Sequence, residues 1–155
     1  MLGDNEVAED YLNKYISFYP NRTIARNIMA DIQISLKKYD VALSLVNRDA
    51  KPFWDLYVKC KAVYAKGDQK EADMLFNEFI TEWGDEAWPN VAEVYAFRGE
   101  KDEAFKWLDL ALENKDITLL EILNFPSMQN LWGDPRWNEF INKLDLPEEH
   151  GFHLD

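Results

Sequence analysis

The chain has 155 residues, 47 % of them hydrophobic and 14 % aromatic, which is enough to bury a core and excludes disorder by composition. Its 29 acidic and 17 basic residues give a formal charge of −12, which repels phosphate backbones and argues against nucleic-acid binding. The single cysteine excludes an internal disulfide, and no apolar run approaches the roughly 18 residues of a membrane span. We therefore expect a cytoplasmic protein that contacts no membrane and favours a neutral or basic partner.

The predicted elements are helices, beginning with residues 4–20. Apolar residues recur at three- and four-residue steps, as on one face of a helix, and no segment shows the sustained alternation of a strand. In the next segment this spacing is carried by Ile24, Ile28, Ile32 and Leu36. The pattern predicts an all-helical protein.

The helical pattern repeats along the chain. The stretch AVYAKGDQKEADMLF, from Ala62, is matched within AEVYAFRGEKDEAFKWL, from Ala92. Alanines at the matching place in four segments, spaced 34, 30 and 32 residues apart, mark the repeat: Ala8, Ala42, Ala72 and Ala104. A period in this range is the signature of helical repeats, whose units of two antiparallel helices bury their apolar faces only by stacking.

Small residues have predictable places within each unit. The alanine lies where the second helix crosses the first, since a larger side chain there would cost about 1–3 kcal/mol by overpacking. The glycine ends the first helix in the left-handed conformation that only glycine adopts cheaply. Gly67 and Gly99 are therefore expected to be turns, because phosphate-binding loops need several glycines. The segment before Ala42 has Lys37 and Lys38 in place of the glycine.

Residues 117–147 break this period. A short helix is predicted over 117–124, followed by a turn at Phe125-Pro126. Asp134-Pro135 is a good helix start, with Asp as the N-cap and Pro at the first position. The helix that follows has an apolar stripe of Trp137, Phe140, Ile141 and Leu144. We interpret the whole segment as a cap over the open end of a stack of repeats.

The repeated pattern resembles that of the tetratricopeptide-repeat family over roughly residues 4–115. The fullest match has Trp88, Val91, Ala92 and Tyr95 in the first helix, Gly99 in the turn, and Ala104, Leu108 and Ala111 in the second helix. A partial match, the second helix of a unit and its closing proline, consists of Ala8, Leu12, Tyr15 and Pro20. The ending, with Leu131, Asp134-Pro135-Arg136-Trp137 and Leu144-Asp145-Leu146-Pro147, is similar to that of bacterial tetratricopeptide regions attached to winged-helix, cyclase or kinase domains.

The resemblance implies a right-handed superhelical stack of antiparallel helix pairs with a C-terminal helical cap. It implies one domain over residues 1–147, followed by a tail at 148–155. The units of that domain would be a partial one at 4–20, full ones at 22–50, 52–84 and 85–115, and capping helices at 117–147. Because the first unit begins at its second helix, we expect the chain to be a fragment of a larger bacterial regulatory or signalling protein.

In this architecture the first helices of successive units line a concave groove. The exposed groove positions that the resemblance implies are Asn27, Asp31, Trp54, Tyr57, Lys61, Tyr64, Glu93 and Phe97. The four on the middle unit share one helix face, and their three aromatic rings and one base suit an extended peptide or an amphipathic helix. Packing in the core is the alternative for this aromatic stripe, and for Tyr64 in particular.

No motif predicts catalysis or a cofactor, since the sequence lacks GxxxxGK[ST], GxSxG and HExxH. His150 and His153 lie in the acidic tail, and we predict no metal site there, because structural zinc sites need four preset ligands. Cys60 is expected to be buried and inert. We therefore expect a non-enzymatic protein-interaction module. A self-associating homodimer and a helical enzyme with an unrecognised site are the alternatives.

Overall fold

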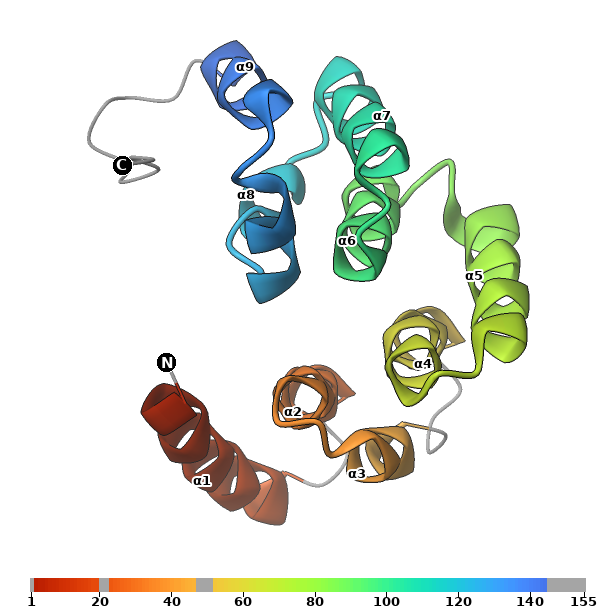
Figure 1. Cartoon of the computed structure of the whole chain (residues 1–155). Coiled ribbons are helices and arrows are strands. Elements are labelled where there is room, and N and C mark those ends of the chain that lie inside the picture. Colours follow the sequence, from red (N-terminus) through yellow and green to blue (C-terminus); the bar gives the residue numbers. More distant parts are fainter. Residues whose placement is uncertain (1, 20–22, 47–51, 145–155) are drawn as a thin grey trace. The chain divides into compact units, whose positions relative to one another are not determined.

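The computed structural model describes residues 2–19, 23–46 and 52–144, and every regular element in these ranges is helical (Figure 1), which confirms the all-α class. The chain divides into two compact units, Met1–Glu82 and Trp83–Asp155. Unit 1 contains α1 (Leu2–Phe18), α2 (Thr23–Ser35), α3 (Tyr39–Leu45), α4 (Pro52–Lys66) and α5 (Gln69–Trp83), which ends at the boundary. Unit 2 contains α6 (Trp88–Arg98), α7 (Lys101–Glu113), α8 (Leu119–Ile122), the 3₁₀ helix η1 (Pro126–Leu131) and α9 (Pro135–Lys143).

In unit 1, α2 packs against α1, α3 and α4, and α3 also contacts α4 (Figure 1). Helices α4 and α5 meet through aromatic rings, with the Phe79 centroid 5.3 Å from that of Phe53 and 5.8 Å from that of Tyr57. Phe79 is fully buried, and burial of such a side chain stabilises the fold by about 1.5–3 kcal/mol. The pairs α2–α3 and α4–α5 fall within the predicted segments 22–50 and 52–84.

The marker alanines lie at close helix crossings in three of the four places. Ala42, Ala72 and Ala104 have no exposed surface, as expected for a small residue between two packed helices. Ala8, on α1, is only half-buried. In α1 the marker alanine is therefore less enclosed by neighbouring helices than its three counterparts are.

The turns after the first helices have the predicted backbone. Gly67 and Gly99 take positive φ angles of +95° and +76°. The N–H of Gly99 donates to the carbonyl of Ala96 and so closes α6. In the turn after α2, where the glycine is missing, Lys37 takes the left-handed conformation itself, with a φ of +60°. A lysine pays a conformational cost there that a glycine would not.

Ion pairs connect successive helix pairs within unit 1. The ammonium of Lys38 lies 3.4 Å from the carboxylate of Glu9 on α1, and that of Lys66 lies 2.5 Å from Asp40 on α3. A hydrogen bond from the buried Gln33, together with Lys38, lowers the pKa of Glu9. Polar contacts thus fasten α1 to α2 beside the apolar ones.

The core of unit 2 joins α6 and α7 to the C-terminal segment. Its buried members come from every helix of the unit: Ala92, Ala96, Ala104, Phe105, Leu108, Ala111, Leu119, Ile122, Leu123, Met128, Leu131, Trp137 and Phe140. Trp137 and Phe140, from the predicted stripe on α9, are almost fully buried. Asp134 caps α9 by accepting from the N–H of Arg136, with Pro135 at the first position, as predicted.

The C-terminal segment keeps the repeat spacing that its sequence seemed to abandon. Four side-chain contacts tie it to α6 and α7, and each joins residues 34 positions apart: Glu93–Ser127, Ala96–Asn130, Asp102–Arg136 and Asp109–Lys143. Thus η1 packs on α6, and α9 on α7, as the next helix pair would. The predicted turn at Phe125-Pro126 lies directly before η1, with Phe125 as its N-cap and Pro126 as its first residue.

Candidate partner-binding site

Four of the predicted groove residues meet between α2 and α4 of unit 1. The ammonium of Lys61 lies 2.7 Å from a carboxylate oxygen of Asp31 and 4.1 Å from the centroid of the Tyr57 ring. The Trp54 ring lies edge-on to Tyr57, with 6.0 Å between centroids. The helical spacing along α4 aligns these side chains on one face, and α2 supplies the acid opposite.

The expectation that these positions are exposed was wrong for three residues of unit 1. Tyr57 is 1 % exposed, Lys61 3 % and Asn27 5 %. The physical reason is that the Tyr57 ring packs against Phe79 of α5, and α2 covers Lys61. The aromatic stripe is therefore partly core, which is the alternative that the sequence left open. Asp31, Trp54 and Tyr64 are half-buried and retain accessible surface.

The ion pair between Asp31 and Lys61 is asymmetric. The lysine side chain is 4 % exposed, whereas the aspartate side chain is 33 % exposed. A buried ammonium needs a partner, and here it has both a carboxylate and the face of a tyrosine ring. Removing Asp31 would leave the buried charge of Lys61 unpaired between α2 and α4, so Asp31 contributes to stability. Its carboxylate nevertheless remains partly accessible to solvent.

Asn27 stands one helical turn before Asp31 on α2. Its side-chain nitrogen is buried and has no hydrogen-bond partner among the described residues. A buried amide without a partner costs about 1–3 kcal/mol, so such groups are uncommon in native proteins. In the free chain this donor is enclosed between the helices and has no contact with solvent.

In unit 2 the two predicted groove residues lie on α6. Glu93 is 1 % exposed, and the hydroxyl of Ser127 in η1 donates to its carboxylate. The side-chain amide of Asn130 donates to the carbonyl of Ala96 over 2.9 Å. The expectation of an open Glu93 was wrong, because η1 of the same chain covers this face of α6. Phe97 is half-buried.

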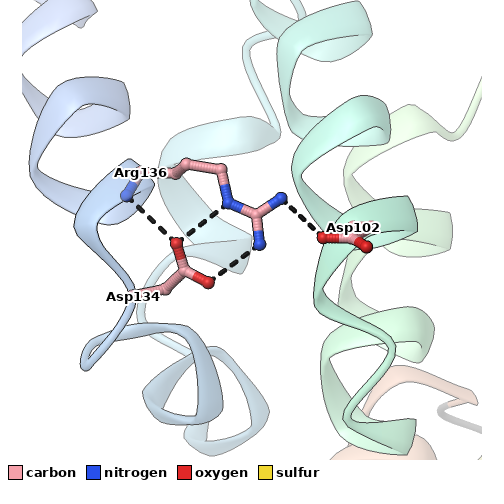
Figure 2. A network of polar contacts seen from close by, with 3 residues as sticks. All are labelled: Asp102, Asp134 and Arg136. Atoms are coloured by element: carbon pink, nitrogen blue, oxygen red, sulfur yellow. Dashed lines mark hydrogen bonds and ion pairs between the residues drawn. The ribbon is translucent and has the colours of Figure 1, made fainter.

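Arg136 fastens α9 to the start of α7, as Figure 2 shows. Its guanidinium donates to both carboxylate oxygens of Asp134, over 2.9 and 2.8 Å, and to Asp102 over 2.7 Å. It also lies 4.5 Å from the centroid of the Phe105 ring. Hydrogen bonds from Arg136 lower the pKa of Asp134 to about 2. The Asp-Pro-Arg motif therefore serves attachment of the last helix.

Sequence reasoning missed Ser127, Asn130 and Arg136 as contact residues. One signal was present in the sequence, since Gly133 follows Gly99 by 34 residues, although it lacks the positive φ of Gly99. The marker alanine is absent at the matching place, where Asn138 stands. The alanine spacing therefore does not predict these contacts.

A hollow of about 410 Å³ opens between α3, α4 and α5, away from the predicted residues. It is lined by Leu43, Lys59, Val63, Lys66, Asp68, Glu71 and Leu75. Two of its charged groups serve the helix ends, since Lys66 pairs with Asp40 and Asp68 accepts from the N–H of Glu71.

The remaining sequence predictions concern the cysteine, metal binding and membrane spans. Cys60 is fully buried, as expected. Within the described ranges, no three His, Cys, Asp or Glu side chains gather as a metal site requires. His150 and His153 lie outside the described residues. None of the helices described is long and apolar enough to cross a membrane.

No protein-family model, curated protein or solved structure matches the chain at a significant level. The resemblance to tetratricopeptide repeats therefore depends on the residues of this chain alone.

Proposed function

We propose that the chain is a non-enzymatic protein-interaction module of the tetratricopeptide-repeat type, in which α2 and α4 bind an extended peptide or a helix of a partner protein. Stacking of its helix pairs into a right-handed superhelix is part of the proposal. It is supported by contacts at the repeat spacing, such as that between Asp31 and Lys61, which are 30 positions apart like Ala42 and Ala72. The module would belong to a larger bacterial regulatory protein.

The placement of buried polar side chains is the observation that carries this proposal. In the described part of the chain, all seven lie on the first helices α2, α4 and α6: Arg26, Asn27, Gln33, Asp55, Lys61, Asn90 and Glu93. Packing alone favours apolar residues, because each buried polar group has a desolvation cost. The second helices α3, α5 and α7 follow that rule, with only apolar residues among their buried side chains. Gln33, Lys61 and Glu93 bond to other helices of the chain, whereas the Asn27 nitrogen has no partner there, and we assign it to recognition of a partner protein.

Recognition of a polypeptide is supported by three features of unit 1. The unpartnered amide of Asn27 suits a backbone carbonyl, which reaches it when the side chains around Asn27 move aside on binding. The half-exposed carboxylate of Asp31 suits a backbone N–H or a basic side chain. The half-buried rings of Trp54 and Tyr64 add apolar surface beside these polar groups. Lys61 holds Asp31 in place rather than contacting the peptide.

The test uses peptides selected from a display library of random short sequences, titrated calorimetrically into the purified full chain. Asn27→Ala should weaken binding at least about tenfold, the loss of one buried hydrogen bond. Its thermal midpoint should change little, because removal of the unpartnered buried amide offsets the packing lost on truncation.

Ile28→Ala is the matched control, because Ile28 is the next residue on α2 and is 48 % exposed. This variant should bind the selected peptides like the unaltered chain. A library that enriches no peptide, or equal affinity of Asn27→Ala and the unaltered chain, would overturn the proposal.

A further inference from the structure

Helix α1 is apolar on two sides. On one side Ala8, Leu12 and Ile16 are half-buried, and α2 is the helix that α1 contacts. On the adjoining side large apolar residues recur at steps of four, four and three and remain 43–77 % exposed: Val7, Tyr11, Tyr15 and Phe18. Tyr19, just beyond the end of α1 and 54 % exposed, lies with its ring tilted against that of Tyr15, with 5.0 Å between ring centroids. We call these five residues the α1 face.

The equivalent surface is covered elsewhere in the same unit. Tyr15 follows the marker Ala8 by seven positions, as Phe79 follows Ala72 on α5. Phe79 has no exposed surface, because the rings of α4 cover it. Tyr15 is 43 % exposed. Unlike Phe79, Tyr15 thus has no helix packed over its ring in the described part of the chain.

We infer that the α1 face is a self-association surface, through which two copies of this chain pair with their α1 helices antiparallel. The first argument is area. Large aromatic side chains bury roughly 150–250 Å² each, so at the observed exposures the face offers roughly 500 Å². Two copies together bury about 1,000 Å², the lower limit for a specific interface. The dimer is therefore a weak one, with a micromolar dissociation constant.

The second argument is the symmetry of the stripe. In an antiparallel pair Val7 lies opposite Phe18 of the second copy, and Tyr11 lies opposite Tyr15, so a small side chain meets a large one at each end. A two-fold interface requires a surface that matches itself in this way. Binding of an unrelated partner would not require the apolar residues of α1 to match one another in this way.

Charge at the edge of the α1 face also suits a second copy. Asp10 and Lys14 pair over 2.7 Å, and their side chains are 66 % and 65 % exposed. The two charges cancel, so this edge does not select a basic partner. In the antiparallel arrangement Asp10 of each copy meets Lys14 of the other, which makes the charges complementary across the interface.

Sedimentation velocity on the full chain over a wide concentration range tests the proposal. The unaltered chain should show a monomer–dimer equilibrium. Tyr11→Asp should raise the dissociation constant at least about tenfold, because it buries a carboxylate at the centre of the interface. Met74→Asp, at a 62 % exposed apolar residue of α5, is the matched control and should leave the equilibrium unchanged.

A charge exchange identifies the occupant of the face. Asp10→Lys alone should weaken the dimer, and the double variant Asp10→Lys, Lys14→Asp should restore it, since each copy then again offers an acid to a base. Circular dichroism confirms that α1 stays helical in each variant.

Three results would overturn the inference. The first is a chain that stays monomeric at every concentration, which is also the result expected if a different protein covers the α1 face. The second is dissociation of the dimer by Met74→Asp. The third is an unchanged dissociation constant in Tyr11→Asp. The inference is independent of the peptide site, so Asn27→Ala should dimerise normally.

Discussion

Lys37, Gly67 and Gly99 share a left-handed backbone conformation in the turns after α2, α4 and α6, with φ of +60°, +95° and +76°. Side chains with a Cβ atom pay about 1–2 kcal/mol in this region. No atom lies within 4 Å of a Cβ added at Gly99, so Gly99→Ala should cost only that strain. We predict that Gly99→Ala lowers the free energy of unfolding by about 1 kcal/mol and that Lys37→Gly raises it by about as much, measured in urea.

Gly133 gives the control for this prediction. It is not among the positive-φ residues, and an added Cβ there also meets nothing within 4 Å. Gly133→Ala should therefore be neutral or slightly stabilising. Equal losses at Gly99 and Gly133 would show that backbone conformation is not the cause.

At the scale of elements, α9 is held at its first turn by the contact of Arg136 with Asp134. The pKa of Asp134 is about 2 in the folded chain, below the ordinary value of about 4. A depressed pKa means that the carboxylate stabilises the fold above about pH 4 and that this contribution is lost as the pH falls towards about 2. We predict that Asp134→Asn, which keeps a capping oxygen, lowers the thermal midpoint near neutral pH.

The difference in midpoint between Asp134→Asn and the unaltered chain should shrink as the pH falls from about 4 to about 2. The same comparison in an Arg136→Gln background supplies the control, because the carboxylate then lacks its main partner. An unchanged pH dependence in that background would contradict the assignment.

The positions of the helices, turns and caps could largely be predicted from the sequence, but the burial of individual side chains could not. Gly67, Gly99 and Asp134 act through backbone conformation that a few neighbouring residues decide, so their roles were predictable. The burial of Tyr57 and Glu93 was not, because it depends on Phe79 in another helix and on Ser127, 34 residues away. Such contacts leave no local mark in one sequence.

At the scale of the whole molecule, the charge of −12 separates the proposed dimer from a complex with a basic partner. Two copies repel each other, so added salt should screen the repulsion and strengthen self-association. A complex with a basic partner should weaken under the same change. We predict that raising the salt concentration lowers the dissociation constant measured by sedimentation, because net repulsion between two chains of −12 outweighs the attraction of the exposed Asp10 and Lys14 side chains across the interface. An increase would contradict pairing of like-charged copies.

Five ion pairs that join successive helix pairs in the described part of the chain run in one direction. In each, the earlier pair supplies the acid and the later one the base: Glu9–Lys38, Asp31–Lys61, Asp40–Lys66, Asp102–Arg136 and Asp109–Lys143. Chains built from similar units risk joining them in the wrong order during folding. An inverted neighbour would set acid against acid, so this one-way arrangement penalises misassembly and guides each helix pair to the one that precedes it.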